Sequence, residues 1–412
     1  MTTPPVLPTA TTSTPRRKPM NYRWLLVLFG LAIIVSILLV YAQNRVYEPS
    51  NPFQGGTGDH VHAFALDPYA SKHMYLGAHY GFFRSTDGGA SWTRLNGNGG
   101  ITKTLVATSI SISPRDARTV YVTGYNIGSG NATGIYVTHD DGSNWQNLAT
   151  GGAGNLPDPR VLFVTAGWAD PAESYAYTID YGLYRTLDRG AHWQQIAPPF
   201  SGQVTTFMPI PTTCSQTTCP EQFYVGTTQG LYTGTAATPT APVVFNATPL
   251  ITGYVYAVAP HHGDQPYVYV SSEQGLFRAD GPGGTLTGVT TVAQGAPTLT
   301  SLAVSGKDAR LLFGVTQQNI VTRSQDGGKT WNAIGASLLT RGLSQLSSGL
   351  RQATGSNTPQ WAGGQNKFLS ILQTDVQSDS THVFAAISFP TQLFLSGDGG
   401  QLWTDLSQGS GA

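Results

Sequence analysis

The sequence predicts an all-β protein, a seven-bladed β-propeller preceded by one N-terminal transmembrane helix. The pattern Ser/Thr-x-Asp-x-Gly-x-x-Trp occurs five times. A wider frame of short apolar and β-rich segments returns seven times, at intervals of about 50 residues, which is typical of propeller blades. An uncharged apolar stretch over residues 24–41 predicts the helix. The five copies of the pattern lie at residues 85–92, 138–145, 186–193, 324–331 and 396–403.

The composition agrees with many short strands joined by tight turns. The 412 residues include 49 Gly, and only 11% are charged. Glycine suits turns, and the many Thr, Val and Tyr residues suit strands. The 22 basic and 22 acidic side chains balance, so the net charge gives no reason to expect nucleic acid as a partner.

The N-terminal region is expected to anchor the protein in a membrane. Residues 1–23 are rich in Pro and Thr, which predicts a disordered tail. The 18 residues from 24 to 41 carry no charge, close to the roughly 20 that span a bilayer. We therefore expect a signal anchor over residues 24–43 and a linker over residues 44–59. Basic residues precede the anchor, which predicts a cytoplasmic tail and an extracytoplasmic propeller in the cell membrane: Arg16, Arg17, Lys18 and Arg23.

A secretory signal peptide cleaved after Ala42 is the alternative, and it would leave a secreted propeller. The apolar stretch is longer than the usual signal core of about 7–15 residues, which favours the anchor. A buried core helix is disfavoured, because no downstream segment looks like its helical partner.

The predicted propeller covers residues 60–412. Each unit holds an apolar strand, a polar turn, a β-rich strand, a short turn and an aromatic-rich strand, and the recurrent pattern lies between the third and fourth strands. Residues 205–234 and 256–280 keep this frame without the pattern. Each small sheet has two apolar faces, and only closure into a ring covers them all.

An insertion at residues 332–367 joins the last two units. Two interpretations of this insertion remain open, a helix that caps the channel mouth and a solvated linker. The helix is suggested by four leucines spaced along one side: Leu339, Leu343, Leu346 and Leu350.

The recurrent aspartate is expected to staple a turn rather than to act in catalysis. Its oxygens and those of the preceding Ser/Thr can accept hydrogen bonds from backbone N–H groups of the turn. The Gly allows a backbone conformation that a Cβ resists, and the Trp buries its ring between blades. The expected structural residues are Asp87, Trp92, Asp140, Trp145, Asp188, Trp193, Asp326, Trp331, Asp398 and Trp403.

These motifs resemble Asp-boxes, also called BNR repeats, of the sialidase-like superfamily. Together with the frame "YVGTTQGLY", they resemble propellers of the photosystem II assembly-factor type, the sortilin type and the BNR glycosidases. The resemblance covers about residues 60–407. It implies the propeller fold, and it does not imply one activity.

Strand order predicts where a ligand binds. The turns between second and third strands share a face with the loops between blades, and the boxes lie on the opposite face. Propellers usually bind ligands on that first face, around the channel. Its candidate residues are His79, Tyr80, Asn126, Asp180, Tyr181, Gln229, Glu273, Gln274, Gln317, Phe389 and Pro390.

No catalytic residue is predicted. The Phe/Tyr-Arg-Ile-Pro signature that the sialidase resemblance implies is absent. A xyloglucanase-like pair of acids would use Asp180 and Glu273, but these belong to the third and fifth units and are expected to lie too far apart. Four arginines recur at one position of the frame, which indicates a structural stripe: Arg84, Arg185, Arg278 and Arg323.

The cysteines and histidines predict a disulfide and no metal site. Cys214 and Cys219 are the only cysteines, and outside the cytoplasm a close pair is best interpreted as a disulfide that clips one hairpin. His60 and His62 share one face of a strand, but no third metal ligand is identifiable from the sequence. No cofactor motif is present.

We therefore expect a membrane-anchored scaffold that binds or assembles a protein or glycan ligand, and no nucleic acid. A BNR-type glycoside hydrolase is the alternative. A sorting or adhesion receptor is a third interpretation, disfavoured because the cysteine-rich module that follows sortilin propellers is missing.

Overall fold

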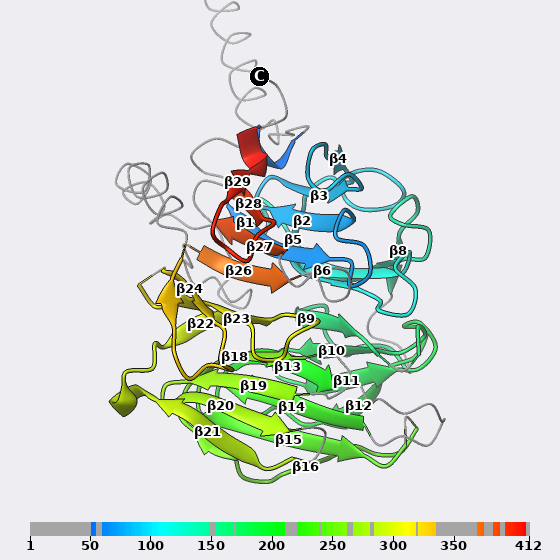
Figure 1. Cartoon of the computed structure of the whole chain (residues 1–412). Helices are drawn as coiled ribbons and strands as arrows, with labels where there is room; N and C mark the ends of the chain where they lie inside the picture. The colour runs from blue at the N-terminus through cyan, green and yellow to red at the C-terminus, as the bar shows by residue number, and fades with distance from the viewer. Residues whose placement is uncertain are drawn as a thin grey trace, which may run out of the picture. The chain divides into compact units, whose positions relative to one another are not determined.

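The computed structural model describes residues 51–54, 60–148, 154–168, 170–210, 221–238, 240–261, 267–280, 284–318, 320–334, 369–374, 382–387 and 392–408. All of these residues belong to one compact unit, Glu48–Ala412 (Figure 1). The expected anchor, the Cys214–Cys219 pair, most of the 332–367 insertion, Phe389 and Pro390 lie outside the described residues. Within the described part of the chain, no helix combines the length and the apolar character that a membrane crossing requires.

The fold is an all-β propeller of seven sheets, each an antiparallel meander of strands that follow one another in the sequence. Blade 1 contains β1 (Val61–Leu66), β2 (Met74–Ala78), β3 (Gly81–Ser85) and β4 (Thr93–Arg94). Blade 2 contains β5 (Leu105–Ile112), β6 (Val120–Asn126), β7 (Ala132–Thr138) and β8 (Gln146–Leu148). Blade 3 contains β9 (Val161–Ala166), β10 (Ser174–Thr178), β11 (Gly182–Thr186) and β12 (Gln194–Ala197).

The remaining blades repeat this plan, and the fourth divides its outer strand in two. Blade 4 contains β13 (Val204–Ile210), β14 (Glu221–Thr227), β15 (Gly230–Ala236), β16 (Val244–Phe245) and β17 (Ile251–Thr252), the last two both pairing with β15. Blade 5 contains β18 (Val255–Pro260), β19 (Tyr267–Ser272), β20 (Gly275–Asp280) and β21 (Leu286–Thr291). Blade 6 contains β22 (Leu299–Val304), β23 (Leu312–Thr316), β24 (Val321–Ser324) and β25 (Asn332–Ala333). Blade 7 contains β26 (Leu369–Thr374), β27 (Val383–Ile387), β28 (Gln392–Ser396) and β29 (Thr404–Asp405).

Within the described residues, three short 3-10 turns accompany the strands: η1 (Pro52–Gln54), η3 (Val292–Gln294) and η5 (Leu406–Gln408). Phe53 of η1 packs edge-on against Trp92 of the first box, with ring centroids 6.0 Å apart. The inner strands β1 and β26 of the first and last blades are in contact, and Phe64 meets Phe384 across that junction at 6.0 Å. Each sheet uses only consecutive strands, so no described strand from one end of the chain joins a sheet at the other end.

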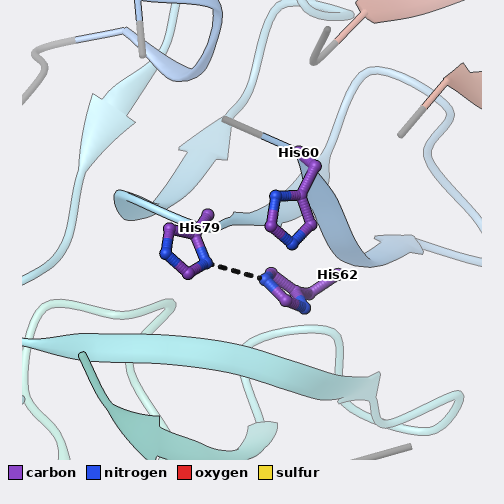
Figure 2. Close-up of side chains that lie close together, drawn as sticks. All are labelled: His60, His62 and His79. Atoms are coloured by element: carbon purple, nitrogen blue, oxygen red, sulfur yellow. Dashed lines mark hydrogen bonds between the residues drawn. The ribbon is translucent and has the colours of Figure 1, made fainter. Parts of the chain in front are cut away.

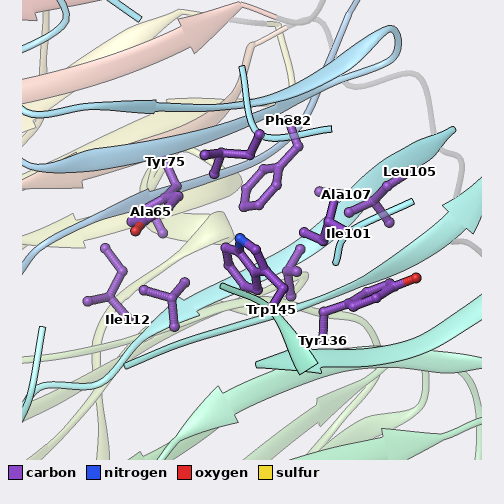
Figure 3. Packing of buried hydrophobic residues seen from close by; sticks show 12 residues of the cluster. Ala65, Tyr75, Phe82, Ile101, Leu105, Ala107, Ile112, Tyr136 and Trp145 are labelled. Carbon is purple, nitrogen blue, oxygen red and sulfur yellow. The ribbon is translucent and has the colours of Figure 1, made fainter. Parts of the chain in front are cut away.

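The hydrophobic core lies between the blades, because each sheet is covered only by its neighbours. Trp145 of the second box packs on Phe82 of blade 1, with centroids 5.6 Å apart, and both are buried with Tyr75 in one cluster (Figure 3). Between blades 3 and 4 the core is also rich in aromatic rings, with Phe163 stacked on Phe207 at 5.4 Å. Such rings bury large apolar areas and dominate the packing energy.

The five boxes share one hydrogen-bond pattern. The first Ser/Thr hydroxyl donates to the box carboxylate at 2.7–2.8 Å in every copy. The same carboxylate accepts the N–H of the residue four positions on at 2.8–2.9 Å. The fifth residue of each box is a glycine with φ between 78° and 90°, a conformation that a side chain disfavours. In the first box, for example, Ser91 donates to Asp87 from both its N–H and its hydroxyl.

The recurrent arginines of the third strands reach into the next blade. Arg84 donates to the backbone carbonyl of Asp141 in the second box, and Arg323 donates to the carbonyl of Gly399, the equivalent residue of the last box, at 2.8 Å. Arg185 donates to the carbonyl of Ala241, in the turn that replaces the box in blade 4, at 3.0 Å. Three of the four arginines are therefore inter-blade ties. Arg278 instead bonds Asp280 of its own strand at 2.7 Å and lies over the Tyr267 ring.

Candidate functional site: the channel mouth opposite the boxes

The inner strand of every blade begins with a β-bulge at the face opposite the boxes. In each blade the pairing of the first two strands shifts by one residue near the start of the inner strand. A bulge bends the strand and re-aims a side chain. The extra residue is half-buried wherever its side chain is described, and it follows a fully buried strand residue. We call these residues the bulge ring: His62, Thr108, Leu162, Thr205, Tyr256 and Thr300.

Three histidines meet at the blade 1 position of the bulge ring (Figure 2). His60 precedes β1, His62 is the bulge residue, and His79 follows β2, whose last residue pairs with Val61. The His62 Nε2 atom lies 3.3 Å from His79 Nδ1. The His60 ring lies 4.3 Å from that of His62 and 4.8 Å from that of His79, centroid to centroid. One hairpin therefore collects three imidazoles.

Two rings of the histidine cluster, His62 and His79, favour the neutral form. Burial, followed by repulsion from His60, lowers the pKa of His79 to about 4. Burial and the two neighbouring imidazoles also hold the pKa of His62 well below its usual value. Tyr125 of blade 2 packs edge-on against His62 at 6.1 Å, and Tyr80 packs edge-on against His79 at 4.8 Å. At neutral pH His62 and His79 can offer lone pairs as well as N–H donors.

A pair of stacked tyrosines marks the blade 5 position of the bulge ring. Tyr254 and Tyr256 stack with centroids 4.6 Å apart, and Gln317 of blade 6 donates its side-chain N–H to the Tyr256 hydroxyl at 2.9 Å. Burial raises the pKa of Tyr256, and the nearby Glu273 carboxylate adds to this effect. The site therefore combines a flat aromatic surface, an amide and an exposed carboxylate.

Asp180, one of the two acids weighed for hydrolysis, is engaged in an ion pair. It occupies the β10–β11 turn with φ of 67°, and its Oδ2 lies 3.1 Å from Arg160 Nη2. Arg160 also bonds Asp158 at 2.8 Å. Tyr181 beside it is 42% exposed. Asp180 therefore already has a charged partner, Arg160, at this end of blade 3.

The other expected ligand-face residues form hydrogen bonds with neighbouring segments of the protein. Thr104 donates to the Asn126 side chain at 2.7 Å, the Gln229 N–H donates to the Thr227 hydroxyl at 3.0 Å, and the Gln274 amide donates to the Thr252 carbonyl at 2.7 Å. The structure therefore brings together His79 with Tyr80, and Glu273 and Gln317 with Tyr256.

Sequence reasoning misses the third histidine, Arg160 and the two stacked tyrosines. Strand order places His79 on the ligand face but does not by itself join it to His60 and His62. The first predicted hairpin could have revealed that His79 lies near His60 and His62, because residues that flank the open end of a hairpin lie side by side. Tyr256 cannot be found this way, since the bulge that re-aims it leaves no mark in the composition.

Among the described residues, the carboxyl groups with the most perturbed environment lie elsewhere, between blades 3 and 4. Glu173 immediately precedes β10 and Glu221 begins β14; they are 1% and 7% exposed. Tyr175 donates to Glu173 at 2.6 Å and lies 3.2 Å from Glu221. Burial, then the Glu221 charge, raises the pKa of Glu173 to about 8. The pair shares one hydroxyl and excludes solvent, so it lacks the substrate-sized gap that glycoside hydrolysis requires.

Comparisons with known proteins identify the architecture. No family model and no curated sequence matches the chain. The GH74 xyloglucanase from Xanthomonas campestris is similar in structure, with a TM-score of 0.59 at 17% identity over 85% of this chain and 55% of that one. The GH74 enzyme from Niastella koreensis gives 0.60 at 14% identity over 86% and 55%.

A second group of similar structures is matched along nearly its whole length. YCF48 bound to a D1 peptide gives a TM-score of 0.52 at 15% identity over 83% of this chain and 94% of that one. YCF48 from Cyanidioschyzon merolae gives 0.51 at 15% identity over 83% and 96%. The chain thus spans about half the length of the GH74 enzymes. At these identities the likeness establishes the fold, and the chain is a seven-bladed β-propeller similar to both groups.

Proposed function

We propose that this protein is a membrane-anchored scaffold whose propeller, on the extracytoplasmic side, binds a segment of a protein partner at the channel mouth opposite the boxes. The observation that carries the proposal is the Tyr254–Tyr256 stack on the bulge ring, in which Gln317 donates a hydrogen bond to the Tyr256 hydroxyl. Tyrosine supplies flat contact area at low entropic cost and a polar edge, which is why it is frequent in binding sites.

The carboxyl groups support binding over hydrolysis. Among the described residues, the five box carboxylates bond within their own turns, Asp180 pairs with Arg160, and Glu173 and Glu221 are buried. A glycosidase needs two carboxyl groups that face each other across the scissile bond. Glu273 is exposed at the mouth, and no partner acid is identified for it in the described part of the chain.

The structural neighbours support the same choice. YCF48, solved with a D1 peptide, is matched over 94% of its length, whereas the GH74 enzymes are matched over 55%. A protein segment is therefore preferred as the ligand. Hydrolysis of a glycan by a GH74-like mechanism is the second candidate, favoured by the higher TM-scores of the GH74 enzymes.

The test is site-specific photo-crosslinking in membranes of the host. A photoreactive residue at Tyr256 is expected to capture a discrete protein partner. The same residue at Leu402, which is 76% exposed on the box face, is the control and is expected to capture none. The Tyr256→Ala variant should weaken binding of the captured partner by about 2 kcal/mol, the size of an interface hot spot.

Two outcomes would overturn the proposal. Equal capture at Tyr256 and Leu402 would show that the partner does not bind specifically at the face opposite the boxes. Hydrolysis of xyloglucan that is lost on Glu273→Gln would establish the enzyme instead. The anchor is tested separately by washing membranes at alkaline pH. The full chain should stay with the membrane, and a chain beginning at residue 44 should be released.

A further inference from the structure

We propose that His60, His62 and His79 form a binding site for one divalent transition-metal ion, with Zn²⁺ as the preferred ion. The inference goes beyond the proposed function, since it requires no partner. One potential ligand atom from each ring lies within 4.8 Å of the other two. The three rings gather at one end of the first hairpin (Figure 2).

The spacing of the ligand atoms matches a tetrahedral ion. Zn²⁺ binds imidazole nitrogen at about 2.0–2.1 Å, which places two ligand atoms of a tetrahedron about 3.3–3.4 Å apart. The His62 Nε2 and His79 Nδ1 atoms are 3.3 Å apart, so this pair already has the required separation. His60 completes the site by a rotation of its side chain, because its ligand atom lies within 4.8 Å of both.

The chemistry of the donors selects the class of ion. Imidazole is a borderline ligand that suits Zn²⁺, Cu²⁺, Ni²⁺ and Fe²⁺, whereas Ca²⁺ and Mg²⁺ require oxygen ligands. Metal ligation uses the lone pair of a neutral imidazole ring. Binding would replace the single hydrogen bond between these two rings with metal–nitrogen bonds.

The backbone supplies the preorganisation. The bulge at His62 turns its ring toward that of His60. The N–H of His79 donates to the carbonyl of His60 at 2.9 Å, which fixes the two ends of the hairpin beside each other. Three protein ligands leave one position of a tetrahedral ion open, as in sites that accept water or an external ligand. That position would face the channel mouth, where a side chain of a bound partner could complete it.

The experiment is a calorimetric titration of the untagged full chain with Zn²⁺, without any partner present. One equivalent is expected to bind. His62→Ala and His79→Ala should each weaken the binding at least as much as the roughly 10- to 100-fold that loss of an outer-shell group costs. The matched control is His192→Ala, which removes an exposed histidine of the third box that pairs with Asp188. This variant should bind like the unmodified chain.

Two further measurements keep the result interpretable. Binding should persist in a Cys214→Ser, Cys219→Ser chain, which excludes thiolate ligands. Replacement of Zn²⁺ by Co²⁺ should give the visible absorption of a tetrahedral ion in the unmodified chain, and this readout does not depend on how well a variant folds. Absence of stoichiometric binding, or binding that survives both histidine substitutions, overturns the proposal. Either result leaves the crosslinking test at Tyr256 unaffected.

Discussion

Two junctions between blades place ionisable side chains at the same positions of the repeat. One junction has balanced charges, and the other has an excess of carboxyl groups. His73 and Glu173 each precede the second strand of their blade, Tyr75 and Tyr175 are the second residues of those strands, and Arg84 and Arg185 pair with these tyrosines across the hairpin. At the first junction the next blade presents Asp141 of its box. At the second it has no box and presents Glu221.

The first junction is balanced in charge and remains ionised. His73 contacts Asp67 at 2.9 Å and Asp141 at 2.7 Å, and Arg84 bonds Asp141 at 2.9 Å. Burial disfavours charged His73, but its bonds to Asp141 and Asp67 outweigh burial and raise its pKa to about 9. Two cations thus face two carboxylates.

The second junction has two carboxyl groups and one cation, so it retains a proton. Arg185 lies 3.6 Å from Glu221, and burial together with the Glu221 charge raises the pKa of Glu173 to about 8. Like charges in a dry site cannot both ionise at low cost. The same structural frame therefore accommodates either arrangement. The protonation of the acidic side chain follows from the balance of charges at each junction.

The largest expected effect comes from Arg185→Ala. It removes the only cation of the second junction among the described residues and leaves two buried carboxyl groups, so the free energy of unfolding should fall by about 3–5 kcal/mol. Arg323→Ala, at the same frame position, removes one bond to the Gly399 carbonyl and should cost about 1 kcal/mol. Chemical denaturation of both variants measures the difference, and equal losses would contradict the comparison.

Glu173→Gln should change how stability depends on pH. A carboxyl group whose pKa is raised in the folded state contributes fully below its unfolded value, about 4.3, and this contribution is lost as the pH rises through about 8. In the variant the amide N–H of Gln replaces the O–H donor of the protonated carboxyl group, and the side chain cannot ionise. It should therefore be more stable than the unmodified chain at pH 8.5, by about 1–3 kcal/mol, with little gain at pH 4.5. Melting temperatures across this range test it, and parallel pH curves would refute it.

His73→Gln should remove a different pH dependence. Because the folded pKa of His73 is raised to about 9, its contribution is complete below the unfolded pKa of about 6.5 and is lost as the pH rises through about 9. The variant should be less stable by about 1–2 kcal/mol at pH 6 and should match the unmodified chain near pH 10. Thermal unfolding at both pH values provides the measurement. A loss that is the same at pH 6 and pH 10 would show that packing, not charge, holds this junction.

The smallest effect is expected within a box. Asp87→Ala removes the bonds from Ser85 and Ser91, which lie inside one exposed turn, and should cost about 1 kcal/mol. Crosslinking at Tyr256 should be unchanged. Unaltered stability combined with lost capture of the partner would assign the box a binding role and end the contrast between the two faces.

Much of the fold can be predicted from the sequence because the repeat depends on interactions between residues that are close together in the chain. The Gly, Asp and Trp of each box act within eight residues, so the five boxes are recognisable from the residues alone. The recurrence of Arg84, Arg185 and Arg323 likewise indicates a structural stripe, and the structure shows these three as ties to the next blade. The expectation that Asp180 and Glu273 do not form a catalytic pair rests on the same spacing, because it assigns them to different blades.

The sequence by itself determined the number of blades, the position of each box and the face on which the boxes lie, because these depend on spacing along the chain. Only the tertiary structure decided which titratable groups meet. Glu173 and Glu221 are brought together from neighbouring blades, and His79 joins His62 through a hairpin whose bulge sets the direction of the ring. Such contacts depend on register and on the adjoining blade, and neither is encoded in the residues on one side of the contact.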